Sequence, residues 1–214
     1  FEKEREIFKN LQIAALLSCK ESVNDFFVKH GLGGVKSSDD QHDNTTKEQE
    51  LISIFEAFTT FAFINGRESL TLVIEAGIDD CMNSMEILGP YSIAKKLQDR
   101  FFKNYIEKGY KKLSKLAIDL LDNNPTLAGL SSETSAAMAI SSIFDQLIED
   151  LKFISNRQLD ISYRYGFVRT AKSHGYKTVN FVNTDGEEDD KIVSLTTRYI
   201  PYSILLNTNS QSKF

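Results

Sequence analysis

Residues 132–156, SETSAAMAISSIFDQLIEDLKFISN, decide the fold of this chain. Their apolar side chains return to one side of a helix at about 100° per residue. This side consists of Ala136, Ala137, Ile140, Ile143, Phe144, Leu147, Leu151 and Ile154. Asp145, Glu149 and Lys152 fall near the opposite side. The small residues of the first half let other helices approach closely, so the stretch is predicted to be the core helix of a bundle.

The composition indicates a soluble globular protein. Of 214 residues, 41% are hydrophobic and 26% are charged, which is ordinary for one domain or a domain with an appendage. The net charge of -5 argues against binding nucleic acid or anionic membrane with the whole surface, although local patches can still bind. Cys19 and Cys81 are too few for a disulfide framework, so we expect buried free thiols in the cytoplasm.

The chain has no apolar run near the ~20 residues of a membrane span. It opens at Phe1 directly into a helical pattern, without signal-peptide features. We therefore expect a fragment of a larger protein. The location that we expect for it is the cytoplasm, either as part of a soluble protein or as the soluble part of a membrane protein.

Several helices are predicted before the core helix. An apolar stripe from Phe8 predicts one long helix to His30, and residues 33–45 read as a mobile loop. A capping box at Thr46 and Gln49 predicts the start of the next helix. A turn at Asn65-Gly66 would make residues 51–62 and 70–88 an antiparallel helix pair.

The next helix is predicted to begin at Pro90 and to end before Pro125. If the helix were straight, the apolar residues after Gly109 would lie on nearly the opposite side from those before it. The helix therefore either kinks there or packs against different neighbours at its two ends.

After residue 156 the pattern changes to the alternation of a half-buried strand over 161–167. Further strands are predicted over about 176–182 and 191–199, followed by a polar tail at 207–214. The predicted fold class is mainly α, an antiparallel bundle of about six helices with a small C-terminal antiparallel β-meander. The predicted division is a helical bundle at 1–156, the meander at 157–206 and the tail.

Two pairs of carboxylates raise the hypothesis of a metal-dependent hydrolase. Glu75 with Asp79, and Asp145 with Glu149, are each one helical turn apart, and Mg²⁺ prefers such oxygen ligands. Both pairs, however, project away from the apolar stripes of their helices, which favours solvated helix faces.

Other chemistry has little support in the sequence. His30, His42 and His174 lie in separate segments, and there is no Gly-x-Ser-x-Gly elbow or phosphate-binding loop. No catalytic residue, metal or cofactor is predicted, and whether the chain is an enzyme stays open, leaning to no.

Residues 90–115 and 151–180 are rich in lysine and arginine with interleaved aromatic residues. Basic residues beside stacking platforms are what single-stranded nucleic acid requires. The candidate ligands for an anion or nucleic acid are Lys95, Arg100, Lys103, Lys111, Arg164, Arg169 and Lys177. The competing interpretation is an ordinary charged surface, because most of the aromatic residues lie on apolar stripes. If there is a working surface, we expect it where the sheet meets helix 91–115.

The leading hypothesis is a non-enzymatic regulatory or protein-interaction domain. Its partner would be another protein, or a second copy bound through the N-terminal helix. The first alternative is nucleic-acid or phosphorylated-ligand binding through the basic stretches, and the second is the metal-dependent hydrolase.

Overall fold

The computed structural model describes residues 2–30, 41–128, 132–181 and 191–194, and it confirms a mainly helical protein. Three helices are long: α1 (Glu2–His30), α2 (Gln41–Ser84) and α6 (Glu133–Ser173). A fourth rod combines α3 (Lys95–Phe101), the π-helix η1 (Phe102–Ile106) and α4 (Glu107–Asp122). The short helix α5 (Pro125–Ala128) precedes α6.

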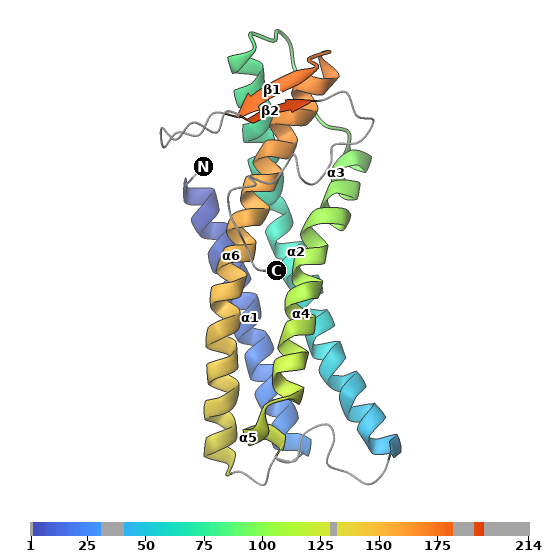
Figure 1. Cartoon of the computed structure of the whole chain (residues 1–214), viewed down its shortest axis with the longest axis vertical. Helices are drawn as coiled ribbons and strands as arrows, with labels where there is room; N and C mark the ends of the chain where they lie inside the picture. Colours follow the sequence, from blue (N-terminus) through green and yellow to red (C-terminus); the bar gives the residue numbers. More distant parts are fainter. Residues whose placement is uncertain (1, 31–40, 129–131, 182–190, 195–214) are drawn as a thin grey trace.

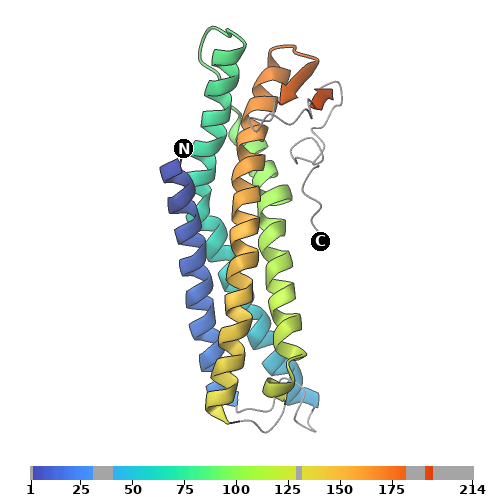
Figure 2. The ribbon, with the colours of Figure 1, turned by 60° about the vertical axis from the view of Figure 1, so that its left-hand side comes forward.

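The four rods form an elongated up-and-down bundle (Figure 1). α1 runs in one direction, α2 returns, the α3–α4 rod follows the direction of α1, and α6 returns again. α2 packs against α1, α4 and α6, and α6 also packs against α1 and α4. Figure 2 shows that α2 and α6 extend past the N-terminus of α1 at one end of the bundle. This end is therefore built mainly from α2 and α6.

α2 corrects the prediction of a helix pair separated by a turn. The helix runs unbroken through Asn65-Gly66. A Cβ on Gly66 would lie 2.6 Å from both Gln12 Nε2 and Phe8 Cε2, so glycine is needed here for contact with α1 rather than for a turn. α2 also begins before the predicted capping box at Thr46. Residues 41–45 of the predicted loop are therefore helical, while 31–40 lie outside the described residues.

α6 corrects the prediction of a strand over 161–167, because the core helix continues to Ser173. The apparent alternation arose because this part of the helix has neighbours on more than one side. Ile161 and Tyr165 are buried, whereas Tyr163 is only half-buried and donates a hydrogen bond to Asp80 Oδ2 at 2.7 Å. The predicted boundary at 156–157 thus falls inside one helix.

α2 and α6 cross at unusually close range. A Cβ on Gly77 would lie 2.1 Å from the carbonyl oxygen of Tyr163, and a Cβ on Gly166 would lie 2.1 Å from that of Ile74. Each glycine therefore faces the backbone of the other helix. A side chain larger than that of glycine does not fit at either position. This crossing fixes the relative position of the two longest helices.

The irregularity predicted near Gly109 is the π-helix η1, a few residues earlier. One extra residue in a turn rotates everything after it, which accounts for the change of apolar side. Both ends of the rod contact α2 and α6: in the first part Leu97 contacts α6 and Phe102 packs on Phe63 of α2, and in the second part Tyr110 packs on Phe58 of α2. Gln158 Nε2 of α6 donates to the carbonyl of Ile106 at 3.1 Å. A Cβ on Gly109 would lie 3.2 Å from that same Nε2.

Two short strands follow α6. β1 (Thr178–Phe181) and β2 (Lys191–Ser194) pair antiparallel, with Val179 opposite Val193. The predicted three-stranded meander is not found in the described parts, because its first strand belongs to α6. The remainder of the third predicted strand and the tail at 207–214 lie outside the described residues.

The core runs the length of the bundle. The stripe of the N-terminal helix, including Phe8, Val23 and Phe26, is buried in it. A smaller cluster under the hairpin contains Cys81, Val168, Ala171 and Val179. Both cysteines are free and buried, and burial raises the pKa of Cys19 to about 12 and of Cys81 to about 11. Within the described ranges, no helix has the length and hydrophobicity needed to cross a bilayer.

Candidate binding surfaces

The seven basic residues predicted to bind an anion do not form one surface. They lie on α3 (Lys95 and Arg100), η1 (Lys103), α4 (Lys111), α6 (Arg164 and Arg169) and immediately before β1 (Lys177). Lys111 forms an ion pair with Glu107 of its own helix at 2.6 Å. Arg164 is partly buried; burial lowers its pKa, and the charge of Asp160 opposes this effect.

Arg100 lies in α3 and Arg169 in α6, and the two helices contact each other through Leu97 and Tyr165. The hydroxyl of Tyr165 donates to the carbonyl of Leu97 at 3.1 Å, and Tyr91 Oη lies 2.6 Å from Ser173 Oγ. Tyr165, Arg169 and Ser173 are spaced four residues apart and share one face of α6. Arg169 is therefore placed between two contacts with the segment 91–97, while Arg100 lies one turn beyond Leu97.

Aromatic rings pack together where α3 and η1 meet α6, near both arginines in the sequence. The rings of Tyr165 and Phe101 stack with centroids 4.2 Å apart, and Tyr105 packs on Phe101 at 5.4 Å. Burial raises the pKa of Tyr165 to about 12, although the charges of Arg169 and Arg100 oppose this rise. We call Arg100, Arg169, Tyr91 and Tyr165 the arginine–tyrosine cluster.

A second surface is the outward face of α2. It exposes three large apolar side chains: Phe61 is 54% exposed, Ile64 62% and Leu72 43%. The helical period places them on one side together with Glu68, Glu75 and Asp79. A shallow, open depression of about 370 Å³ lies here on the surface of α2, lined by Ile64, Arg67, Glu68, Thr71, Leu72 and Glu75. We call this surface the α2 face.

The charge on the α2 face is acidic. Glu68, Glu75 and Asp79 are exposed, and none forms an ion pair with any residue in the described parts of the chain. Arg67 is held elsewhere, because it pairs with Asp99 of α3 and its guanidinium carbon lies 5.3 Å from the ring centre of Phe102. The α2 face therefore combines apolar side chains with carboxylates that are free to meet a cation.

The carboxylates proposed for a metal site are not assembled into one. Asp145 and Glu149 are exposed on α6, and Glu149 pairs with Lys152 at 2.6 Å. In the described ranges no group of three or more His, Cys, Asp or Glu side chains could hold a metal ion. The metal-dependent hydrolase hypothesis thus gains no support from the geometry.

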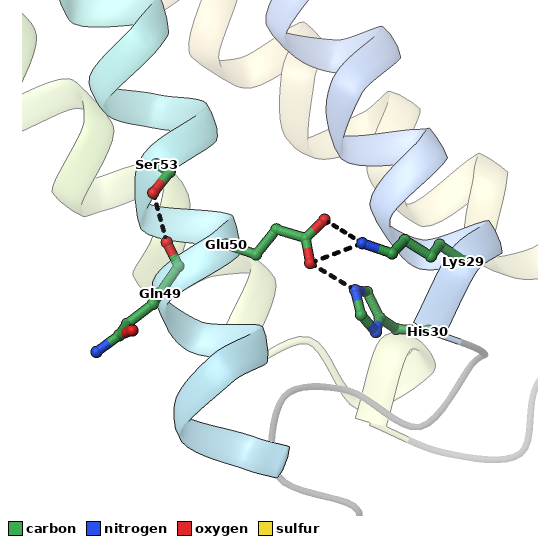
Figure 3. Close-up of polar contacts among 5 residues, drawn as sticks. All are labelled: Lys29, His30, Gln49, Glu50 and Ser53. Atoms are coloured by element: carbon green, nitrogen blue, oxygen red, sulfur yellow. Dashed lines mark hydrogen bonds and ion pairs between the residues drawn. The ribbon is translucent and has the colours of Figure 1, made fainter. Parts of the chain in front are cut away.

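The histidines are separated as well. His174 Nδ1 lies 2.9 Å from the carbonyl oxygen of Thr170, at the end of α6. His30 closes the far end of the bundle, where its Nε2 lies 2.8 Å from Glu50 Oε2 (Figure 3). Lys29 Nζ lies 2.8 Å and 3.1 Å from the two oxygens of the same carboxylate. Glu50 of α2 thus connects α2 to the last turn of α1 through both ion pairs.

The Glu50 contacts predict a pH-dependent contribution to stability. Hydrogen bonds from Lys29 first, and then from His30, hold the pKa of the Glu50 carboxyl below its ordinary value of 4.5. A lowered pKa in the folded state stabilises the protein above the unfolded-state pKa, and this stabilisation is lost as the pH falls through the folded-state pKa. We expect Glu50→Gln to lower the urea midpoint modestly at about pH 7, and we expect its difference from the wild type to shrink as the pH falls below 4.5.

Glu48→Gln is the matched control for this prediction. Glu48 is exposed on the same helix and has no ion-pair partner among the described residues, so its substitution changes the net charge equally. A difference for Glu50→Gln that stayed constant from neutral to acidic pH would show that the ion pairs contribute nothing.

Comparisons with protein-family models, with curated proteins and with solved structures find no match to this chain. Its fold defines an up-and-down helical bundle with two candidate binding surfaces at different places. What it binds must therefore be inferred from those surfaces. Sequence reasoning selected Arg100 and Arg169, but it missed the α2 face because the predicted turn at Asn65-Gly66 divided it.

Proposed function

We propose that this chain is a non-enzymatic interaction domain that binds a basic amphipathic helix of a partner protein along the α2 face. The observation that carries the proposal is the exposure of Phe61, Ile64 and Leu72 on one side of α2, whose opposite side is buried in the core. Contiguous apolar surface of this kind is typical of a docking site. A helix laid in a groove makes contact through apolar residues at such spacings.

The carboxylates determine which helix fits. Glu68, Glu75 and Asp79 lie among the apolar residues, so lysine or arginine on the partner would meet unpaired negative charge. A second copy of the α2 face would bring carboxylates against carboxylates, which opposes self-association through this surface.

The N-terminal helix suits this role less well than expected. Its apolar stripe is used inside the bundle, where Phe8, Val23 and Phe26 are buried. Its exposed apolar residues, Ile7, Leu17 and Val28, are scattered along the helix. We therefore assign the interaction to α2 rather than to α1.

The proposal is tested with a synthetic helical peptide of about 18 residues, the length of the face, with leucines on one side and lysines on the other. We expect saturable binding, measured by fluorescence anisotropy. Because a charge at the centre of an apolar contact is costly, Ile64→Glu and Leu72→Glu should each weaken binding about tenfold or more.

Met138→Glu is the matched control, because Met138 is exposed on α6, away from α2, and the variant adds the same charge. Its affinity should equal that of the wild type, and a peptide with glutamate in place of lysine should not bind. Equal affinity for the wild type and Leu72→Glu would refute the proposal. Dimerisation that Leu72→Glu abolishes would replace the basic partner with a second copy.

A further inference from the structure

The arginine–tyrosine cluster carries an inference that does not depend on the α2 face. The guanidinium groups of Arg100 and Arg169 have no hydrogen-bond or ion-pair partner among the described residues; the backbone carbonyl of Arg169 accepts from Ser173 Oγ. Arg100 is exposed, whereas Arg169 is partly buried and its Nε is enclosed without an acceptor. A guanidinium group placed in a protein without a carboxylate is a natural receptor for an external anion.

The surroundings hold Arg169 in place. The hydrogen bonds of Tyr165 with Leu97 and of Tyr91 with Ser173 lie one turn before it and one turn after it. Both bonds join α6 to the segment 91–97, so the arginine stem is enclosed between two fixed contacts. Fixed donors lose less conformational entropy on binding than mobile surface lysines do.

The chemistry of the cluster selects the anion. Two guanidinium groups present two planar forks and two positive charges. A carboxylate fits one fork and carries one charge. A phosphate monoester is tetrahedral and nearly doubly charged at neutral pH, so its oxygens can accept from two forks together. Nucleic acid would need a longer track of cations, whereas Lys111 lies further along the α3–α4 rod and is paired with Glu107.

We propose that Arg100 and Arg169 form a binding site for a phosphate monoester, enclosed by Tyr91 and Tyr165. The phosphate would sit over the contact between α6 and α3, with Arg169 as its fixed donor and Arg100 closing on it from the exposed side. Lys95 is exposed at the start of α3 and adds positive charge nearby. Of the seven basic residues predicted from the sequence to bind an anion, the inference assigns two, Arg100 and Arg169, to the phosphate site.

The experiment uses the full chain and titrates it with inorganic phosphate at constant ionic strength, with chloride as the exchanged anion. Calorimetry measures affinity, and amide NMR shifts locate the ion. We expect saturable binding with a dissociation constant of order 1 mM or below. Hydrogen bonds to charged groups contribute strongly, so Arg100→Gln and Arg169→Gln should each weaken binding about tenfold. Shifts should centre on residues 97–100 and 165–173.

Lys112→Gln is the matched control, since Lys112 is exposed on α4 and the variant loses the same charge. It should bind phosphate as the wild type does. Arg100→Gln removes an exposed side chain, so it reports on binding even if Arg169→Gln unfolds. Glycerol 3-phosphate should bind at least as tightly as phosphate, which identifies a monoester site.

Three results would overturn the inference. The first is equal weakening by Lys112→Gln and Arg100→Gln, which would indicate a general effect of charge. The second is the absence of saturation at about 50 mM phosphate. The third is tight binding of a single-stranded oligonucleotide that Lys103→Gln and Lys111→Gln abolish, which would assign the basic residues to nucleic acid.

Discussion

Gly166→Ala is expected to lower the free energy of unfolding by about 3 kcal/mol. Its new methyl carbon would lie 2.1 Å from the carbonyl oxygen of Ile74, and backbone cannot move aside as a side chain can. The two helices would have to separate along their longest contact. Alanine favours a helix over glycine by about 1 kcal/mol, so the clash must overcome that gain. Urea unfolding followed by circular dichroism measures the loss.

Gly109→Ala is the matched control, because it is the same substitution inside a helix of the same bundle. Its nearest neighbours are side-chain atoms of Gln158 and Ile154, both at 3.2 Å. We expect a change within about 1 kcal/mol. Gly77→Ala should behave like Gly166→Ala, since it meets the carbonyl oxygen of Tyr163. Equal stability of Gly166→Ala and the wild type would mean that the helices do not cross at these glycines.

Phe144→Ala is expected to cost about 3–5 kcal/mol, because it leaves a cavity in the middle of the bundle. Phe144 is 0% exposed and its ring lies 6.4 Å from that of Phe55 in α2. The contact between α2 and α6 therefore depends on glycine where the two helices cross. Elsewhere along the bundle, two phenylalanines fill the space between the same helices. Thermal and urea unfolding both measure the effect.

Phe153→Ala provides the comparison for this loss, because it removes the same side chain from the same helix. Phe153 is 41% exposed, so its removal opens no enclosed cavity. The expected cost is below about 1 kcal/mol. Similar losses for the two variants would contradict the assignment of Phe144 to the core.

The helical class could be predicted because the apolar period of about 3.6 residues is clear in most of the chain. The strand prediction at 161–167 failed for a physical reason. Tyr163 donates a hydrogen bond to Asp80 of α2, while Tyr165 donates one to the carbonyl of Leu97 in α3. Apolar residues therefore occur on several sides of one helix. A helix with neighbours on several sides loses the one-sided period on which the prediction depends.

Glycines caused the other error in the fold. Asn65-Gly66 has the sequence of a turn, yet Gly66 allows Phe8 and Gln12 of α1 to approach α2. Local sequence cannot distinguish a glycine chosen for its backbone freedom from one chosen for close packing. The error hid the α2 face, whose exposed apolar residues Phe61 and Leu72 lie on either side of this position.

The candidate sites were only partly predictable. The basic composition of the two stretches was visible in the sequence. The expected meeting of a sheet with helix 91–115 was wrong in form, because Tyr165, which contacts Leu97, belongs to α6 and not to a strand. The placement of Arg100 and Arg169 on either side of the contact between α3 and α6 depends on tertiary structure. The distance of Lys111 from them depends on the course of the α3–α4 rod. Neither feature is encoded in local spacing.

The central claim is that α2 and α6 are single continuous helices, because both proposed binding surfaces depend on it. The most direct measurement is the set of backbone ¹³C chemical shifts of residues 61–72 and 157–173. We predict helical shifts at every position, through Asn65-Gly66 and through residues 161–167. Turn-type shifts at Asn65-Gly66 would break up the α2 face, and strand-type shifts at 161–167 would separate Tyr165 from Arg169, so either result would contradict the account.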